Sequence, residues 1–260
     1  MNILNSDRFI EELLQVVYKA GSEVIKHHKA NIETCFKEDG SPVTEADKAS
    51  DKIILDGLGL LARGVEVISE ENVTNHASSL PDTYFLVDPL DGTKEFLKND
   101  GAGGFTINVA LIRKKKPILG VVYAPAIGRM FYCTQFGGAF ENGKPIKVRK
   151  VLRSGPVAVA SVSHRDQKTD NWLRLNKIQK IISIGSSLKL CLLACGEADV
   201  YPRFSPTMEW DIGAGHAILN SAGGRIEQLD GEELEYGKSE FRNGSFIAFG
   251  GSQRYNKLNV

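Results

Sequence analysis

Two carboxylates stand three positions apart in one tight loop that follows a fully apolar segment. Residues 88–93 read Asp-Pro-Leu-Asp-Gly-Thr, and the apolar residues 84–87 before them are typical of a buried strand. Carboxylates and backbone carbonyls are the ligands that magnesium prefers, and the free amides of a helix beginning at Thr93 suit a phosphate group. Proline and Asp-Gly are also common in ordinary turns. The position directly after a strand favours a loop that holds metal ions and a phosphoryl group together.

Two further acidic sites have comparable positions in the chain. Glu70 follows the predicted strand 65–68, and Asp211 stands at the start of a predicted helix. An acid at the cap or in the first turn of a helix stabilises it by about 1 kcal/mol, which is sufficient to explain Asp211 taken alone. Together with Asp88 and Asp91, however, these acids form the carboxylate cluster that a phosphatase with several metal ions needs.

Thr44 and Asp47 precede an apolar pattern of helical period over residues 44–61. They fit a capping box in which Asp47 takes the place of the usual glutamate. A structural cap is the preferred interpretation of Thr44. Asp47 remains a candidate for chemistry as well.

Two other patterns are interpreted as structural. Residues 138–145 lack the final Ser or Thr of a phosphate-binding loop, and their Asn142-Gly143 pair is typical of a hairpin turn. Cys191 and Cys195 lie one helical turn apart, but neither a histidine nor a second cysteine pair accompanies them. Buried thiols that pack as small hydrophobic groups are the simpler explanation.

The composition limits the class of protein. The 260 residues include 32 basic and 32 acidic side chains, so the net charge is zero and a nucleic-acid binder with a global basic excess is not indicated. Four cysteines are too few for a disulfide framework, and we find neither a signal peptide nor a membrane span. We therefore expect a cytoplasmic protein, which attracts any anionic substrate through a local pocket.

Hydrophobic periodicity predicts the elements that position these residues. Helices are expected at 9–25 and 44–61, followed by several strands without intervening helices, which favours an antiparallel sheet in the first half. After about residue 154, strands and helices alternate, which favours a mixed sheet. We place a boundary between residues 1–153, an α+β metal-binding domain, and residues 154–260, an α/β domain that supplies Asp211 and the substrate pocket. The predicted strands lie at 65–68, 84–87, 105–112, 118–123, 129–134, 157–162, 199–203, 225–229 and 246–249, and the later helices at 186–195 and 211–221.

Taken in combination, the acidic motifs resemble those of the lithium-sensitive inositol monophosphatase superfamily. The shared signature is an acidic pair after a strand (here Glu70-Glu71), then Asp-Pro-Leu-Asp-Gly-Thr, and later Trp210-Asp211. Three further segments resemble the bacterial 3'(2'),5'-bisphosphate nucleotidases of sulfur assimilation: residues 92–96 (Gly-Thr-Lys-Glu-Phe), 185–189 (Gly-Ser-Ser-Leu-Lys) and 201–204 (Tyr-Pro-Arg-Phe). The resemblance covers nearly the whole chain and implies a layered fold of alternating α-β-α-β-α arrangement.

The resemblance also implies which residues hold the metal ions. Glu70, Asp88 and the Leu90 carbonyl correspond to ligands of one magnesium ion, and Asp88, Asp91 and Asp211 to ligands of a second. Glu70 would help to hold a third ion through water. Manganese is expected as a substitute for magnesium, and lithium and calcium are expected to inhibit. Calcium tolerates a looser coordination than magnesium requires.

Activity and substrate follow from the same resemblance. The family branch converts adenosine 3',5'-bisphosphate to AMP and phosphate, with Asp47, Thr93 and Glu70 as the catalytic residues and the pair Asp47–Thr93 orienting and deprotonating water. Predicted contacts to the substrate come from Leu90, Asp91, Gly92, Thr93, His164, Ser186, Lys189, Arg203 and Asp211. Lys189 and Arg203 are the candidates for the 5'-phosphate, because each charge interrupts an apolar segment, whereas solvated surface charge is the usual fate of such residues.

Two alternatives stay open at this point. The nearest is a phosphatase for inositol phosphate or another sugar phosphate, since the metal site does not distinguish these substrates. The other is a protein of the same fold that binds RNA or the transcription machinery, against which the zero net charge argues. A monomer or homodimer is expected, and a peripheral position on the inner face of the cytoplasmic membrane is the alternative to a free cytoplasmic one.

Overall fold

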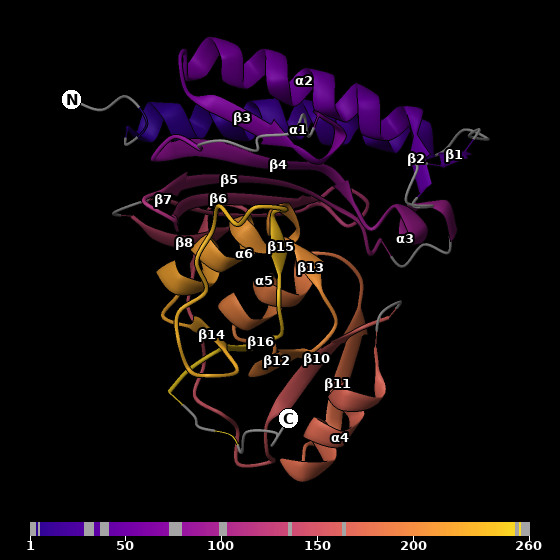
Figure 1. Ribbon diagram of the computed structural model, residues 1–260, viewed down its shortest axis with the longest axis vertical. Coiled ribbons are helices and arrows are strands. Elements are labelled where there is room, and N and C mark those ends of the chain that lie inside the picture. Colours follow the sequence, from indigo (N-terminus) through magenta and orange to yellow (C-terminus); the bar gives the residue numbers. More distant parts are fainter. Residues whose placement is uncertain are drawn as a thin grey trace.

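Helices and sheets alternate in layers in the computed structural model, as predicted (Figure 1). It describes residues 4, 6–28, 34–36, 42–72, 80–98, 103–134, 137–162, 165–252 and 255. Helices α1 (Asp7–His28) and α2 (Glu45–Leu61) cover one face of a seven-stranded sheet. Helices α5 (Leu188–Ala194) and α6 (Glu209–Ser221) lie between that sheet and a five-stranded one. Helix α4 (Gln167–Leu175) lies at the far end of the molecule.

The seven-stranded sheet has the order β3-β4-β5-β6-β7-β8-β9. Its pairs are antiparallel except β3–β4, which is parallel. Asn142 and Gly143, with φ of 47° and 79°, form the β8–β9 turn, which confirms the predicted hairpin. The strands are β3 (Glu66–Ser69), β4 (Thr83–Asp91), β5 (Thr106–Arg113), β6 (Lys116–Ala124), β7 (Arg129–Thr134), β8 (Gly138–Glu141) and β9 (Lys144–Ile146).

The five-stranded sheet has the order β11-β10-β12-β16-β14 and is mixed, as predicted. β10 pairs in parallel with β11 and β12, whereas β16 pairs antiparallel with β12 and β14. Residues 147–156 connect the two sheets, and the predicted domain boundary at residue 153 stays a prediction. The strands are β10 (Val157–Ser161), β11 (Lys180–Ile184), β12 (Val200–Arg203), β14 (Arg225–Gln228) and β16 (Phe246–Phe249).

Short elements complete the described part of the chain. They comprise two antiparallel pairs of short strands, a 3-10 turn before β4 in the chain and a six-residue helix after it. None of the described helices combines the length and the apolar character needed to cross a lipid bilayer. The short elements are β1 (Thr34–Phe36), β2 (Pro42–Thr44), β13 (Thr207–Met208), β15 (Arg242–Asn243), the 3-10 turn Glu70–Asn72 and α3 (Thr93–Lys98).

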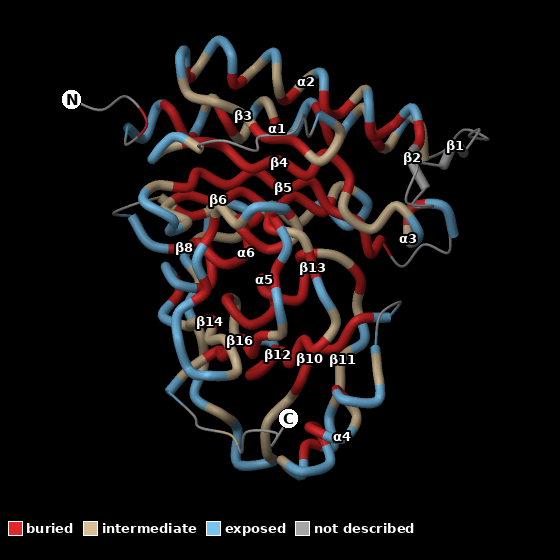
Figure 2. Tube along the Cα trace, viewed as in Figure 1, coloured by how far each residue is buried: buried red, intermediate tan, exposed pale blue. Residues whose placement is uncertain are grey.

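The close contact between α6 and the seven-stranded sheet fixes where Asp211 lies. A Cβ atom added at Gly120 on β6 would lie 2.2 Å from the carbonyl oxygen of Ala214, so only glycine permits this approach. Strands β4 and β5 and helices α5 and α6 are the most continuously buried parts (Figure 2). The first turn of α6 is thereby held against the sheet whose strand β4 carries Asp88 and Asp91.

Candidate active site

A bulge at the end of β4 exposes the acidic loop to a pocket. The pairing of β4 with β5 shifts register between Asp88 and Asp91, and the Leu90 amide donates to Asp88 Oδ1 at 3.1 Å. Gly92 has a φ of 87°, and a Cβ there would lie 2.9 Å from the Gly104 carbonyl oxygen. The turn therefore needs glycine, and α3 begins at the next residue, Thr93.

The acidic loop lines a cavity of about 320 Å³ together with residues from distant parts of the chain. The structure brings together here nearly all of the residues predicted for metal and substrate. Of the predicted residues that the structure describes, Asp47 alone does not line it and instead contacts Thr93, which does. His164 lies outside the described residues. The predicted residues that line the cavity are Glu70, Asp88, Leu90, Asp91, Gly92, Thr93, Ser186, Lys189, Arg203 and Asp211.

Burial and mutual repulsion dominate the electrostatics of the carboxylates that line the cavity. Asp88 is 1% exposed, and burial, reinforced by the negative charges of Glu70, Asp91, Asp211 and Asp47, raises its pKa well above the ordinary value. Burial and the charges of Asp91 and Glu70 likewise raise the pKa of Asp211 well above the ordinary value. Such a cluster is stabilised as carboxylates only by positive charge, and its oxygens are the donors that hard divalent cations take.

These donors therefore suit magnesium by type and charge, although they are not gathered tightly. No three of the four predicted carboxylates, all of them among the described residues, have oxygens within 4.8 Å of one another. Like charges favour such separation. A distributed set of this kind suits ligands shared between several cations better than a single compact site.

Asp47 and Thr93 lie in contact beside the acidic loop. The predicted capping box of Thr44 and Asp47 is confirmed, because the Thr44 amide donates to Asp47 Oδ2 at 2.8 Å. The second oxygen, Asp47 Oδ1, accepts from the Thr93 hydroxyl at 3.4 Å, and that hydroxyl is 3.2 Å from the Leu90 carbonyl oxygen. Asp47 is buried, which raises its pKa from the ordinary value. One carboxylate thus caps α2 and reaches the hydroxyl at the pocket.

Two buried cations line the same cavity. Lys189 and Arg203 are only 6% and 8% exposed, so neither is the solvated surface charge that was considered as their alternative. Burial lowers the pKa of Lys189 to about 8, with Asp91 opposing the shift and Arg203 adding to it. The Arg203 guanidinium donates to the Ser205 and Pro206 carbonyls at 3.0 and 3.1 Å, which fixes its direction. Ser186 beside them has a φ of 51°, and its buried hydroxyl has no hydrogen-bond partner among the described residues.

Sequence reasoning missed several residues that line or support the cavity. Ser187 and Tyr201 line it, and Asn108 on β5 donates to the Ser187 hydroxyl at 2.8 Å. Lys189 Nζ lies 5.6 Å from the centre of the Tyr201 ring, a cation–π contact. Asn108 left one signal in the sequence, since it is, with Thr106, one of two polar residues within the apolar run 105–112, and both are buried.

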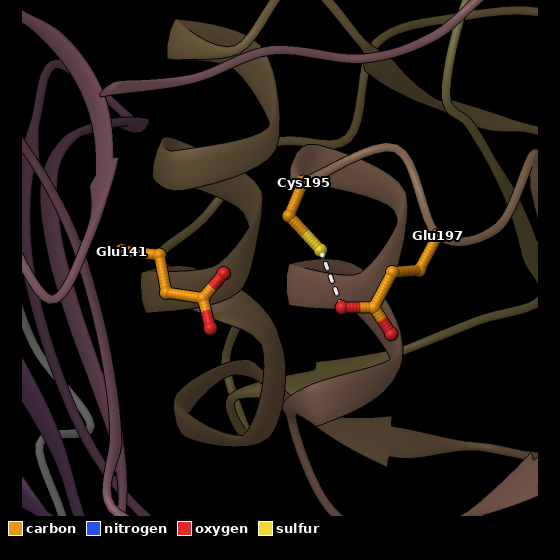
Figure 3. A group of neighbouring side chains, drawn as sticks. All are labelled: Glu141, Cys195 and Glu197. Carbon is orange, nitrogen blue, oxygen red and sulfur yellow. Dashed lines mark hydrogen bonds between the residues drawn. The ribbon is translucent and has the colours of Figure 1, made fainter. Parts of the chain in front are cut away.

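A second acidic cluster lies away from this cavity. Ligand atoms of Glu141, Cys195 and Glu197 lie within 4.8 Å of one another (Figure 3). Arg129 donates to Glu141 and to Glu197 at 2.6 Å each and lies 3.7 Å from the Cys195 sulfur. Burial and the charge of Glu197 raise the pKa of Cys195 to about 11, which keeps it a thiol. The guanidinium is the cation of this cluster, which joins β7 and β8 to the end of α5.

Comparison with known proteins gives one consistent family. The model of the inositol monophosphatase family matches residues 5–257. The 3'(2'),5'-bisphosphate nucleotidase CysQ of Salmonella typhimurium is 40% identical over 247 residues, which cover 91% of this chain and 98% of that protein. The crystal structure of CysQ from Bacteroides thetaiotaomicron has a TM-score of 0.78 and 34% identity, with 92% and 96% of the two chains covered. The Thermotoga maritima IMPase has a TM-score of 0.79 and 26% identity, with 95% and 93% covered.

Proposed function

Because the chain belongs to the inositol monophosphatase family, we propose that it removes the 3'-phosphate of adenosine 3',5'-bisphosphate with the help of magnesium. The observation that carries the proposal is that one cavity is lined both by four carboxylates and by two buried cations. A substrate with two phosphates engages both sets of charges at once, whereas a monophosphate engages one. The name and 40% identity of the Salmonella typhimurium relative support this substrate. A role in sulfate assimilation belongs to the same proposal.

The metal ions would be held by Glu70, Asp88, Asp91 and Asp211, with the Leu90 carbonyl as a further ligand. When bound, divalent ions supply positive charge that offsets the negative charge developing on the phosphoryl oxygens and the leaving oxygen. Two to three ions of magnesium, or of manganese in its place, match the number and distribution of these carboxylates. The family membership and the charge of the cluster support this assignment.

Asp47 and Thr93 are proposed to hold and deprotonate the attacking water. The Thr93 hydroxyl, in contact with Asp47 Oδ1, lies at the first residue of α3 and lines the cavity. A water that donates to Thr93 passes its proton along the hydroxyl to the Asp47 carboxylate. Its capping bonds hold that carboxylate in place, so it needs no reorganisation during the reaction. No side chain has to act as a nucleophile in this scheme.

Lys189 and Arg203 are proposed to bind the 5'-phosphate, with Ser186 as a hydrogen-bonding neighbour. Both cations are buried and line the cavity. A bound phosphate would give them the polar contacts that water gives to an exposed cation. Arg203 is fixed by two backbone carbonyls, so little side-chain entropy is lost on binding. Charge-assisted contacts of this kind contribute roughly 1.5–3 kcal/mol each. The same contacts discriminate against inositol phosphate, which carries no second phosphate.

The test is a phosphate-release assay on a small panel of substrates. Adenosine 3',5'-bisphosphate, 3'-AMP and inositol 1-phosphate are compared at saturating magnesium, with 3'-AMP as the matched control because it lacks only the 5'-phosphate. We expect kcat/KM to be highest for the bisphosphate and at least about tenfold lower for the other two, from one lost charge-assisted contact. Equal or faster release from inositol 1-phosphate would overturn the proposed substrate.

A further inference from the structure

The Ser187 hydroxyl lies where two of the proposed metal ligands meet. Its Oγ atom is 3.0 Å from Asp91 Oδ2 and within hydrogen-bond distance of the backbone carbonyl of Asp211. Asn108 Nδ2 donates to the same Oγ at 2.8 Å and is 3.5 Å from Asp91 Oδ2. A hydroxyl has one proton, so Ser187 accepts from Asn108 while it donates to one of the two aspartate oxygens. The side chain therefore lies between Asp91 and the first turn of α6, close to both.

These residues come from separate parts of the fold. Asp91 ends β4 and Asn108 belongs to β5 in the seven-stranded sheet, whereas Ser187 precedes α5 and Asp211 belongs to α6 (Figure 1). Packing of α6 against the sheet brings its first turn near β4, and the Ser187 contact adds a side-chain link between Asp91 and Asp211. Ser187 is the side chain that makes this contact in the described part of the site.

Core packing alone does not explain this pair of residues. Asn108 and Ser187 are 1% and 4% exposed, and Asn108 interrupts a strand of apolar residues. The Asn108 Oδ1 atom is buried without a hydrogen-bond partner among the described residues. A buried amide with an unpaired oxygen destabilises a core, so its presence beside an acidic site favours a role in that site.

We propose that Ser187, held in place by Asn108, is a positioning residue that sets the orientation of Asp91 and its separation from Asp211 for metal binding. Ser187 contacts Oδ2 of the carboxylate and so orients Asp91, while Oδ1 takes no part in this contact. Asn108 lies at the 3.5 Å limit of a hydrogen bond from the same Oδ2 and acts mainly by holding Ser187. Residues that orient metal ligands in this way typically change metal affinity by about 10- to 100-fold when they are replaced. The inference rests on the proposed function, because it takes Asp91 and Asp211 as metal ligands.

The test measures metal binding directly. Titration calorimetry with magnesium and with manganese is carried out on the wild type, Ser187→Ala and Ser187→Thr, without substrate. Ser187→Ala is expected to weaken binding about 10- to 100-fold, and Ser187→Thr, which keeps the hydroxyl, to restore most of it. Ser187→Cys keeps the volume with a weaker donor and replaces the alanine variant if that variant does not fold.

The matched control is Thr169→Val. Thr169 is also buried, and its hydroxyl also donates to a carboxylate, Asp166 Oδ1, at 2.7 Å. It belongs to α4, and it is not among the residues that line the cavity. Thr169→Val is expected to lower the melting temperature without changing metal affinity, so a general loss of stability is separated from a loss of ligand orientation.

Asn108 is tested with a double-mutant cycle. Asn108→Leu removes the donor at similar volume, and Asn108→Ser replaces it if the leucine variant does not fold. Since Asn108 acts through Ser187, the double variant with Ser187→Ala is expected to bind metal about as weakly as Ser187→Ala alone. Independent, multiplied losses would overturn the role assigned to Asn108.

The two ways to fail are distinguishable. A wild type that binds neither magnesium nor manganese overturns the proposed function itself. A wild type that binds and uses magnesium, while Ser187→Ala binds it equally well, overturns only the role of Ser187. A lowered melting temperature at unchanged metal affinity has the same meaning, because a merely structural role moves stability alone.

Discussion

His216 is expected to make the stability of the protein depend on pH. It lies on α6, 4% exposed, with Nδ1 2.9 Å from the Tyr236 hydroxyl. Burial lowers its pKa from 6.5 to about 4, with Lys116 and Lys238 adding to the shift and Glu233 opposing it. The folded protein therefore keeps the ring neutral where the unfolded chain has already bound a proton. The stabilisation is fully present above the unfolded pKa and is lost as the pH falls towards the folded one.

The size of this effect follows from linkage. A shift of one pKa unit corresponds to about 1.4 kcal/mol, so the contribution lost between pH 7 and pH 4.5 is about 2 kcal/mol. The comparison is between the wild type and His216→Gln, whose amide still bonds to Tyr236 and does not titrate. Any packing cost of glutamine is the same at both pH values. All other titrating groups are common to the two proteins.

Urea unfolding at pH 7 and at pH 4.5 measures the effect. The free energy of unfolding should fall by about 2 kcal/mol more for the wild type than for His216→Gln over this interval. If both proteins lose the same free energy, His216 is protonated in the folded state near its ordinary pKa, and the argument from burial is wrong. An imidazole titration by NMR would then place that pKa near 6.5.

Three further predictions concern the metal site and the core. Activity should vanish in excess EDTA and return with magnesium, and Asp91→Asn should abolish turnover with an unchanged circular dichroism spectrum; undiminished turnover in EDTA would exclude a metal mechanism. Submillimolar to millimolar lithium should inhibit at limiting magnesium, since a small singly charged ion fills a magnesium position without supplying the second positive charge of magnesium. Calcium should inhibit as well. A rate unchanged by either ion would contradict the prediction for that ion. Gly120→Val should lower the free energy of unfolding by at least about 1–3 kcal/mol, because its Cβ would lie 2.2 Å from the Ala214 carbonyl; a melting temperature equal to that of the wild type would contradict this contact.

The fold was largely predictable because its long elements have clear periodicity. Helix α2 begins at the predicted cap Thr44, and β4 carries the apolar run that indicated a buried strand. The strand β9 was not predicted, because three residues are too few for a pattern. α4 and β11 were not predicted, since residues 167–184 mix polar and apolar side chains without a clear period.

The acidic part of the site was more accessible to sequence reasoning than its supports. The sequence placed Asp88 and Asp91 in a loop after the strand 84–87, whereas the structure continues β4 to Asp91, with a register shift between the two residues. The contact of Ser187 with Asp91 joins residues 96 positions apart, and nothing local in the sequence encodes it. The burial of Lys189 could be inferred from its apolar neighbours, but the carbonyls that fix Arg203 depend on the path of the chain after β12.

The most direct test of the central claim is the effect of Lys189→Ala on two substrates that differ by one phosphate. The cation is buried and lines the cavity that the carboxylates also line; if it binds the 5'-phosphate as proposed, its loss should weaken binding of that phosphate alone. The KM for adenosine 3',5'-bisphosphate should rise about 10- to 100-fold, and Arg203→Ala should act likewise, while the KM for 3'-AMP changes little. Equal losses on both substrates would contradict the account, because Lys189 would then support the fold or the acidic site rather than recognise a second phosphate.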